Sequence, residues 1–351
     1  PTLGFTVGFM TSHVRGPETG LTRVLVTGAN GFVGRHLCEK LSTATTLVRA
    51  IVRSDWPERP ANVELALFEG LSDRRGIARA VEGVDVLVHL AARVHRFTSK
   101  GSSAFPPYYR DNVEGTEILL EEAARASVRR FIFGSSVKAL AEASDRPLDP
   151  YVQPEPSTPY GISKLMAERG VAAARNEVET VSLRFPLVYG PGMKGNMLML
   201  FRLVDTGLPL PFRITDNARS VLYIENLAAA VQAVVDANTI SDNVYHVCDD
   251  VSPSTAALIE QIGRALDRQA RWIPMPTRLL RYAARMADPV AQLAGVRRAS
   301  KTLSPLLESL VLDRGSLERD FGYSAPYSLQ AGLRSTAKWY RGTPSRTPTD
   351  P

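Results

Sequence analysis

Residues 27–34 read TGANGFVG, with a glycine at every third position from Gly28 to Gly34. The stretch RVLV at 23–26 precedes this turn and predicts a short buried strand, and the pattern at 33–41 predicts a helix after it. A chain that leaves a strand and enters a helix must turn tightly, and glycines let its backbone approach a pyrophosphate closely. The free N–H groups of the helix N-terminus then favour the phosphates. We therefore predict a dinucleotide-binding turn, the alternative being a plain structural turn. Its binding residues are Gly28, Asn30, Gly31, Phe32, Val33 and Gly34.

Strands and helices alternate outward from this turn. The strands are short, continuous apolar runs, which is typical of a parallel sheet covered by helices on both faces. The predicted fold is α/β, a doubly wound Rossmann-type parallel sheet with a smaller mixed C-terminal lobe. Further strands are expected at 48–52, 63–68, 86–90, 131–134 and 180–185, and helices at 75–81, 112–126, 159–175, 222–237, 255–266, 277–287 and 328–340.

The pattern changes after Tyr189, where Gly190, Pro191 and Gly192 interrupt it. A chain of 351 residues is long enough for two domains of about 150 residues each. We expect a flexible leader at 1–21, a dinucleotide-binding domain at 22–190 rejoined by 220–248, a substrate lobe at 191–219 and 249–340, and a disordered tail at 341–351.

Composition narrows the class of protein. Two cysteines cannot form a disulfide framework, and the five histidines are scattered, so we expect no metal site and a cytoplasmic location. No apolar run is long enough for a membrane span. The net charge is +6, but no basic stripe interleaved with aromatics predicts nucleic-acid binding. The apolar and basic stretch 277–287 is interpreted as a helix of the second lobe, with a membrane-surface helix as the alternative.

The residue after the second predicted strand bears on the choice of dinucleotide. An acidic side chain there would accept hydrogen bonds from the ribose hydroxyls of NAD, but this chain has Arg53. A guanidinium suits a 2′-phosphate, so we favour NADP(H) over NAD(H). Asp55 is the counter-evidence, since it could take the acidic role if the strand ended later.

Tyr160 and Lys164 stand four apart at the start of a predicted helix, with Thr158 as a plausible N-cap and Pro159 as first residue. This spacing places both side chains on one face. An ammonium there stabilises a phenolate, and a nicotinamide cation would add to the effect. Ser136 follows the fifth predicted strand, where a hydroxyl can orient a substrate oxygen.

Together these features resemble the extended short-chain dehydrogenase/reductase family, in its NAD-dependent epimerase/dehydratase branch. The resemblance covers about residues 22–340. Within the branch, the chain is similar to bacterial UDP-glucose 4-epimerase-like proteins, several of which reduce UDP-4-keto sugars for surface polysaccharide and O-antigen. The motifs that carry it are TGANGFVG (27–34), HLAA (89–92), NVEGT (112–116), SSVKALAE (135–142), RFPLVYGPG (184–192) and RSVLYIEN (219–226).

The resemblance implies a role for each matched residue. Tyr160 would be the acid/base at the sugar C4 oxygen, Lys164 would bind the nicotinamide ribose and lower the tyrosine pKa, and Ser136 would hold the C4 oxygen. Asn196 and Arg219 would hold the nucleotide diphosphate. The cofactor cleft would also be lined by Leu90, Ala91, Ala92, Asn112, Pro186 and Val188.

Two departures from the family pattern matter. Gly70 stands where relatives often carry an acidic residue at the adenine. Val137 and Lys138 replace the Asp-Glu pair that 4,6-dehydratases need, so dehydratase chemistry is discounted. We therefore predict NADP(H)-dependent reduction of a UDP-linked 4-keto hexose by a homodimer. The alternatives are a UDP-sugar 4-epimerase and a non-catalytic dinucleotide-binding regulatory protein.

Overall fold

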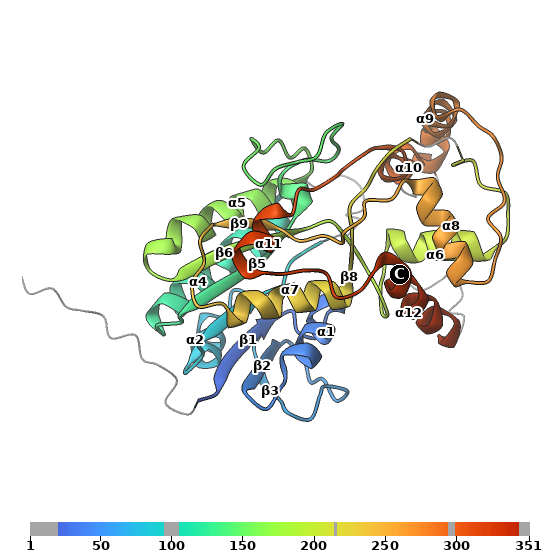
Figure 1. The fold of residues 1–351 in the computed structure, drawn as a ribbon. Helices are drawn as coiled ribbons and strands as arrows, with labels where there is room; N and C mark the ends of the chain where they lie inside the picture. Colours follow the sequence, from blue (N-terminus) through green and yellow to red (C-terminus); the bar gives the residue numbers. More distant parts are fainter. Residues whose placement is uncertain (1–19, 95–104, 214–215, 294–298, 344–351) are drawn as a thin grey trace, which may run out of the picture.

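A computed structural model describes residues 20–94, 105–213, 216–293 and 299–343 (Figure 1). No helix within these ranges is long and apolar enough to cross a membrane. The predicted leader and tail lie largely outside them. Where the structure does describe the tail, it corrects the prediction. Arg341 and Gly342 are the last residues of the final helix, and the exposed Arg341 guanidinium pairs with the Asp267 carboxylate at 2.8 Å.

The centre of the molecule is a parallel sheet, as the sequence predicts. It has seven strands, and the seventh, Val244–His246, lies outside the six expected ranges. The strand order, β3-β2-β1-β4-β5-β6-β9, reverses direction beside β1. In doubly wound sheets this reversal opens a crevice at the carboxyl ends of the strands. The strands are β1 (Thr22–Thr27), β2 (Thr46–Val52), β3 (Val63–Leu67), β4 (Val86–His89), β5 (Arg130–Ser136), β6 (Glu179–Phe185) and β9 (Val244–His246).

Helices cover both faces of this sheet (Figure 1). Successive β1 side chains point to opposite faces, so Val24 and Val26 belong to one apolar core and Leu25 to the other. Helices α1 (Phe32–Leu41) and α7 (Ile224–Asp236) pack on the first core, and α2 (Arg74–Val81), α4 (Gly115–Arg125) and α5 (Pro159–Ala173) pack on the second.

A second lobe lies beyond the carboxyl ends of the strands (Figure 1). It is mostly helical, and a small parallel pair of strands connects it to the sheet. The division of the chain into domains that the sequence analysis expects stays a prediction. The elements are β7 (Leu187–Tyr189), β8 (Val221–Tyr223), α6 (Asn196–Asp205), α8 (Thr255–Ala265), α9 (Thr277–Leu293), α10 (Ala299–Leu307) and α12 (Leu329–Gly342), while α11 (Gly315–Phe321) lies near β9.

Two predicted helices begin differently in the structure. The helix expected from 112 starts earlier, as α3 (Phe105–Tyr108) and a π-helical segment (Tyr109–Glu114) that runs into α4. The helix expected from 222 starts at Ile224, because Val221–Tyr223 forms β8 and pairs with β7. Apolar periodicity cannot separate a short buried strand from the first turn of a helix.

Candidate active site

A cavity of about 1770 Å³ lies at the carboxyl ends of the strands and extends into the second lobe. It holds nearly all of the predicted site residues. Those in its wall are Gly28, Asn30, Gly31, Phe32, Val33, Gly34, Arg53, Leu90, Ala91, Ala92, Ser136, Tyr160, Lys164, Pro186, Val188, Asn196 and Arg219.

The glycine-rich turn has no space for side chains at two of its positions. Gly28 has a φ of +66°, and a Cβ there would lie 2.9 Å from the backbone nitrogen of Ala91. A Cβ on Gly34 would lie 2.2 Å from the Gly28 carbonyl oxygen. The first glycine therefore lets the turn approach the segment after β4, and the third lets α1 begin directly against the turn.

The N-terminus of α1 suits a pyrophosphate. Gly31 is the N-cap and makes no side-chain hydrogen bond to the first turn, and that turn contains no acidic residue. Backbone N–H groups at such a terminus attract anions through unpaired donors and the helix dipole. Because these donors border the cavity and the glycines keep the approach clear, the residues present fit a bound dinucleotide.

A buried polar network joins the end of β1 to the backbone segment that follows β4, next to the glycine-rich turn. The Thr27 hydroxyl oxygen accepts hydrogen bonds from the backbone nitrogens of Leu90, at 3.1 Å, and Ala91, at 3.0 Å. The His89 imidazole contacts the hydroxyls of Thr27 and Thr116, at 2.7 and 3.1 Å. Burial lowers the pKa of His89 to about 3, so the ring is neutral and serves the packing of the core.

Arg53 and Asp55 differ in their relation to the cavity. Arg53 directly follows β2 and lies in the cavity wall. The Asp55 carboxylate instead accepts a hydrogen bond from the backbone nitrogen of Trp56, at 2.8 Å, and lies 4.0 Å from the Arg59 guanidinium. Asp55 is absent from the cavity wall, so the guanidinium is the group presented at the end of β2.

Tyr160 is held by the start of α5. The Thr158 hydroxyl caps the helix by accepting a hydrogen bond from the Gly161 nitrogen at 3.1 Å, and Pro159 is the first helical residue. The Tyr160 ring packs edge-on against Tyr108 at 6.4 Å between centroids. Burial raises the pKa of Tyr160 to about 12, although a hydrogen bond with Ser136 lowers it. The phenol is therefore protonated at neutral pH.

Lys164 lies one helical turn from Tyr160 and is buried. Its Nζ donates to the Gly134 carbonyl oxygen at 2.6 Å and lies 3.9 Å from the centroid of the Phe133 ring. Burial lowers the pKa of Lys164 to about 7. In the chain itself burial dominates the pKa of both groups, and Lys164 bonds the Gly134 carbonyl; its expected effect on the tyrosine pKa with a bound dinucleotide stays a prediction.

The two serines at the end of β5 have different environments. The Ser136 hydroxyl accepts a hydrogen bond from the Lys138 nitrogen at 3.2 Å, and it lies in the cavity beside Tyr160. The Ser135 hydroxyl donates to the buried Glu168 carboxylate at 2.5 Å. Successive strand residues point to opposite faces, so of the two hydroxyls it is the Ser136 hydroxyl that lies beside Tyr160.

Asn112 does not line the cavity, which corrects the prediction from the resemblance. Its amide nitrogen donates to the Ser163 hydroxyl at 2.9 Å and to the Arg93 carbonyl at 3.1 Å, and its amide oxygen accepts from the Arg93 nitrogen at 2.7 Å. The π-helical segment turns this side chain inward. Asn112 therefore positions the wall segment at Arg93 and the helix α5.

The far end of the cavity lies in the second lobe. Asn196 is the first residue of α6, after Gly195, which has a φ of +72°. The Arg219 guanidinium donates to the Glu308 carbonyl oxygen at 3.0 Å, and burial lowers its pKa. Both side chains reach the same cavity as the glycine-rich turn, which is the arrangement needed to hold the two ends of a long ligand.

Other polar residues in the wall, among them Glu142, Lys138, Arg281 and Arg285, were not assigned to the site from the sequence. Glu142 accepts a hydrogen bond from the Thr158 hydroxyl at 2.8 Å and pairs with Lys138. Arg281 and Arg285 belong to α9 and border the cavity from the second lobe. Their spacing of four indicated a shared helix face, but only tertiary packing places that face beside the cavity.

Comparison with known proteins adds the family context. A sequence model of the NAD-dependent epimerase/dehydratase family matches residues 24–248. A UDP-glucose 4-epimerase of Vibrio cholerae is 30% identical, over 90% of this chain and 94% of that protein. A ceramide reductase of Caulobacter vibrioides is 32% identical, over 91% and 94% respectively. The crystal structure of UDP-glucuronic acid 4-epimerase from Bacillus cereus with NAD is 20% identical, with a TM-score of 0.70 over 92% of this chain and 99% of that one. This last similarity supports the fold.

Proposed function

The chain belongs to the NAD-dependent epimerase/dehydratase family, and from this premise we propose that it is an oxidoreductase acting at C4 of a UDP-linked sugar. One observation carries the proposal. Tyr160 and Ser136 are hydrogen-bonded in a cavity that also contains the glycine-rich turn and, in the second lobe, Arg219. A nucleotide sugar held by the second lobe would present its sugar to the tyrosine.

The proposed chemistry divides among three side chains. Tyr160 donates a proton to the C4 oxygen during reduction, or removes it during oxidation. Ser136 hydrogen-bonds the same oxygen and fixes its direction. Lys164 positions the cofactor ribose from the floor of the cavity. A nicotinamide dinucleotide held by the glycine-rich turn would supply or accept the hydride at C4.

We favour net reduction with NADP(H), and Arg53 supports this direction. Its guanidinium borders the cavity at the end of β2, where it could pair with a 2′-phosphate. The relatives named above include both an epimerase and a reductase. A 4-epimerase, the second candidate, would use the same three side chains, retain its dinucleotide and return the hydride to the opposite face of the sugar.

The decisive experiment incubates the purified chain with NADPH or NADH and a panel of UDP- and dTDP-linked 4-keto sugars. Loss of absorbance at 340 nm, with a reduced sugar of one configuration at C4, would establish the reductase. Interconversion of two UDP-hexoses without consumption of NADPH would establish the epimerase. A protein that binds dinucleotide but converts no sugar of the panel would favour the regulatory alternative.

We also propose that the chain forms a homodimer in the cytoplasm, with α4 and α5 packed as a four-helix bundle. The outer face of α5 carries Ile162, Leu165 and Met166, which are all only partly buried. A second copy of the chain packed on this face would remove these apolar side chains from water, which favours the dimer. Sedimentation velocity of the wild type and of Leu165→Glu tests this, since a charge on that face should yield monomers.

A further inference from the structure

One side of helix α9 presents large apolar side chains to solvent. Leu279, Tyr282 and Met286 are 53%, 62% and 61% exposed. At about 100° per residue these three span an arc of about 60° on the helix surface. Leu280 and Ala284 lie on the opposite side and are buried, so packing in the lobe does not require the exposed row.

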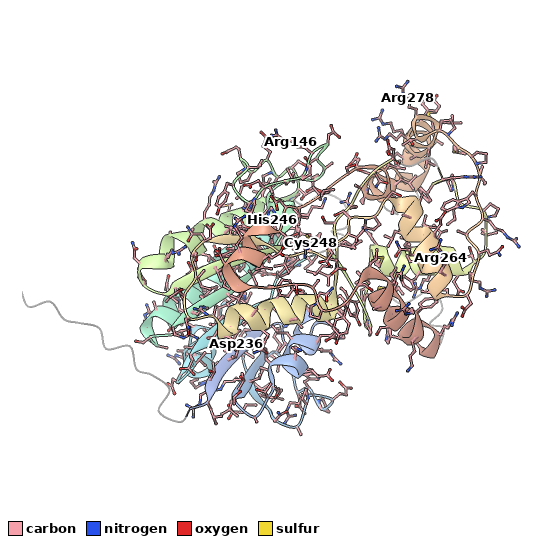
Figure 2. All side chains as sticks on the ribbon, viewed as in Figure 1. Arg146, Asp236, His246, Cys248, Arg264 and Arg278 are labelled. Atoms are coloured by element: carbon pink, nitrogen blue, oxygen red, sulfur yellow. The ribbon has the colours of Figure 1, made fainter. Side chains whose placement is uncertain are left out.

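A second row, of arginines, runs beside the apolar one. Arg278, Arg281 and Arg285 span the adjoining arc of about 60°, and all three are exposed. Figure 2 shows Arg278 directed outward at the far end of the second lobe. Asp288 is the one acidic residue in the sequence of the helix. The exposed side of α9 is therefore half apolar and half basic, with the Arg281 guanidinium also donating to the Leu307 carbonyl oxygen at 3.4 Å.

We propose that this side of α9, defined by Leu279, Tyr282, Met286, Arg278, Arg281 and Arg285, docks the protein on the surface of an anionic lipid bilayer. The apolar row would enter the boundary between headgroups and acyl chains, and the arginines would pair with lipid phosphates. The net charge of +6 adds a long-range attraction to such a surface.

The charge on α9 distinguishes a bilayer from a second copy of the chain. A symmetric dimer through this face would use the same patch on both subunits, so it would gather the arginine rows of two copies in one interface. An anionic headgroup layer complements the row instead. Docking would also place the cavity near the lipid surface, since Arg281, Ala284 and Arg285 form part of its wall.

This inference goes beyond the proposed function, because binding to lipid needs neither a sugar nor a dinucleotide. The test is sedimentation of the full chain with vesicles of phosphatidylcholine alone or mixed with phosphatidylglycerol. We expect binding to the anionic vesicles, weakened by high salt. The variant Leu279→Gln/Tyr282→Gln/Met286→Gln should bind more than about tenfold more weakly. Arg278→Glu should weaken binding by at least about fivefold.

The matched control changes three apolar residues with similar exposure elsewhere. Tyr151, Leu208 and Val251 are 65%, 62% and 53% exposed, and their glutamine variants should bind vesicles like the wild type. Tyr160→Phe should also bind normally, which separates docking from catalysis. Absence of vesicle binding by the wild type, equal loss in the control, or a dimer that depends on Leu279, Tyr282 and Met286 would each overturn the proposal.

Discussion

The Glu168 carboxylate and the Arg184 guanidinium form a doubly hydrogen-bonded pair in the interior of the protein. Arg184 Nη2 lies 2.7 Å from Glu168 Oε2, and Nε lies 3.0 Å from Oε1, with both side chains 4% exposed. The pair joins α5 to β6, and Glu168 also accepts the Ser135 hydrogen bond. Since α5 carries Tyr160 and Lys164, this pair fixes the catalytic helix against the sheet.

Removing one member of this pair should destabilise the fold strongly. Glu168→Ala leaves Arg184 buried without its carboxylate, which costs about 3–5 kcal/mol in the free energy of unfolding. Urea denaturation of the wild type and the variant measures this change in the free energy of unfolding. The control is Asp267→Ala, which removes an exposed pair with Arg341 and should cost less than about 1 kcal/mol. Equal losses in both variants would contradict this account.

Tyr160→Phe should reduce kcat by about 10²–10⁴-fold, because the substitution removes the hydroxyl that exchanges the proton in the proposed mechanism. Dinucleotide binding, measured by fluorescence titration, should change by less than about twofold. Tyr151→Phe alters an exposed tyrosine and should leave turnover unchanged. Retention of turnover in Tyr160→Phe would refute the assigned role.

Gly34→Ala should abolish dinucleotide binding and lower stability by about 1–3 kcal/mol, because the new Cβ overlaps the backbone of the turn. Isothermal titration and thermal unfolding report the two effects. Gly170→Ala provides the control. Nothing lies within 4 Å of a Cβ at that helical position, so the substitution should be neutral or stabilising.

Arg53→Ser should weaken NADPH binding by about tenfold or more and leave NADH binding nearly unchanged, since only the former has a phosphate for the guanidinium. The dissociation constants of NADPH and NADH, measured for the wild type and for Arg53→Ser, test this prediction. An equal change in the two constants would show that Arg53 does not contact the 2′-phosphate.

His36 should make stability depend on pH. Burial lowers its pKa, but hydrogen bonds to the Glu225 carboxylate and the Pro191 carbonyl outweigh this effect, so the pKa is raised above 6.5. A base with a raised pKa stabilises the fold fully below its unfolded pKa of 6.5, and this contribution is lost as pH rises through the folded value. The difference in the free energy of unfolding between the wild type and His36→Asn should therefore shrink as pH rises from 6 to 9. Lys164, whose lowered pKa gives the opposite trend, is present in both proteins, so its contribution cancels in this difference.

Much of this protein follows from local sequence. The glycine-rich turn, the alternation of apolar strands with helices, the N-cap at Thr158 and the Tyr160–Lys164 spacing each depend on a few neighbouring residues, and the structure has each of these features. Such features are predictable because backbone conformation and helical periodicity are set by short-range interactions.

Other features required the tertiary structure. The inward turn of Asn112, the approach of Arg281 to the cavity and the exposure of the apolar row on α9 depend on which distant segments pack together. The pKa values of Tyr160 and Lys164 depend on burial, which one helix cannot supply. The sequence by itself determined the type and order of the main elements from the glycine-rich turn to the strand that ends at Phe185, because these arise within a few residues. It did not give the short strands Leu187–Tyr189, Val221–Tyr223 and Val244–His246. Only the folded chain decided which side chains lose water and which remain exposed, because that depends on contacts between residues far apart in the sequence.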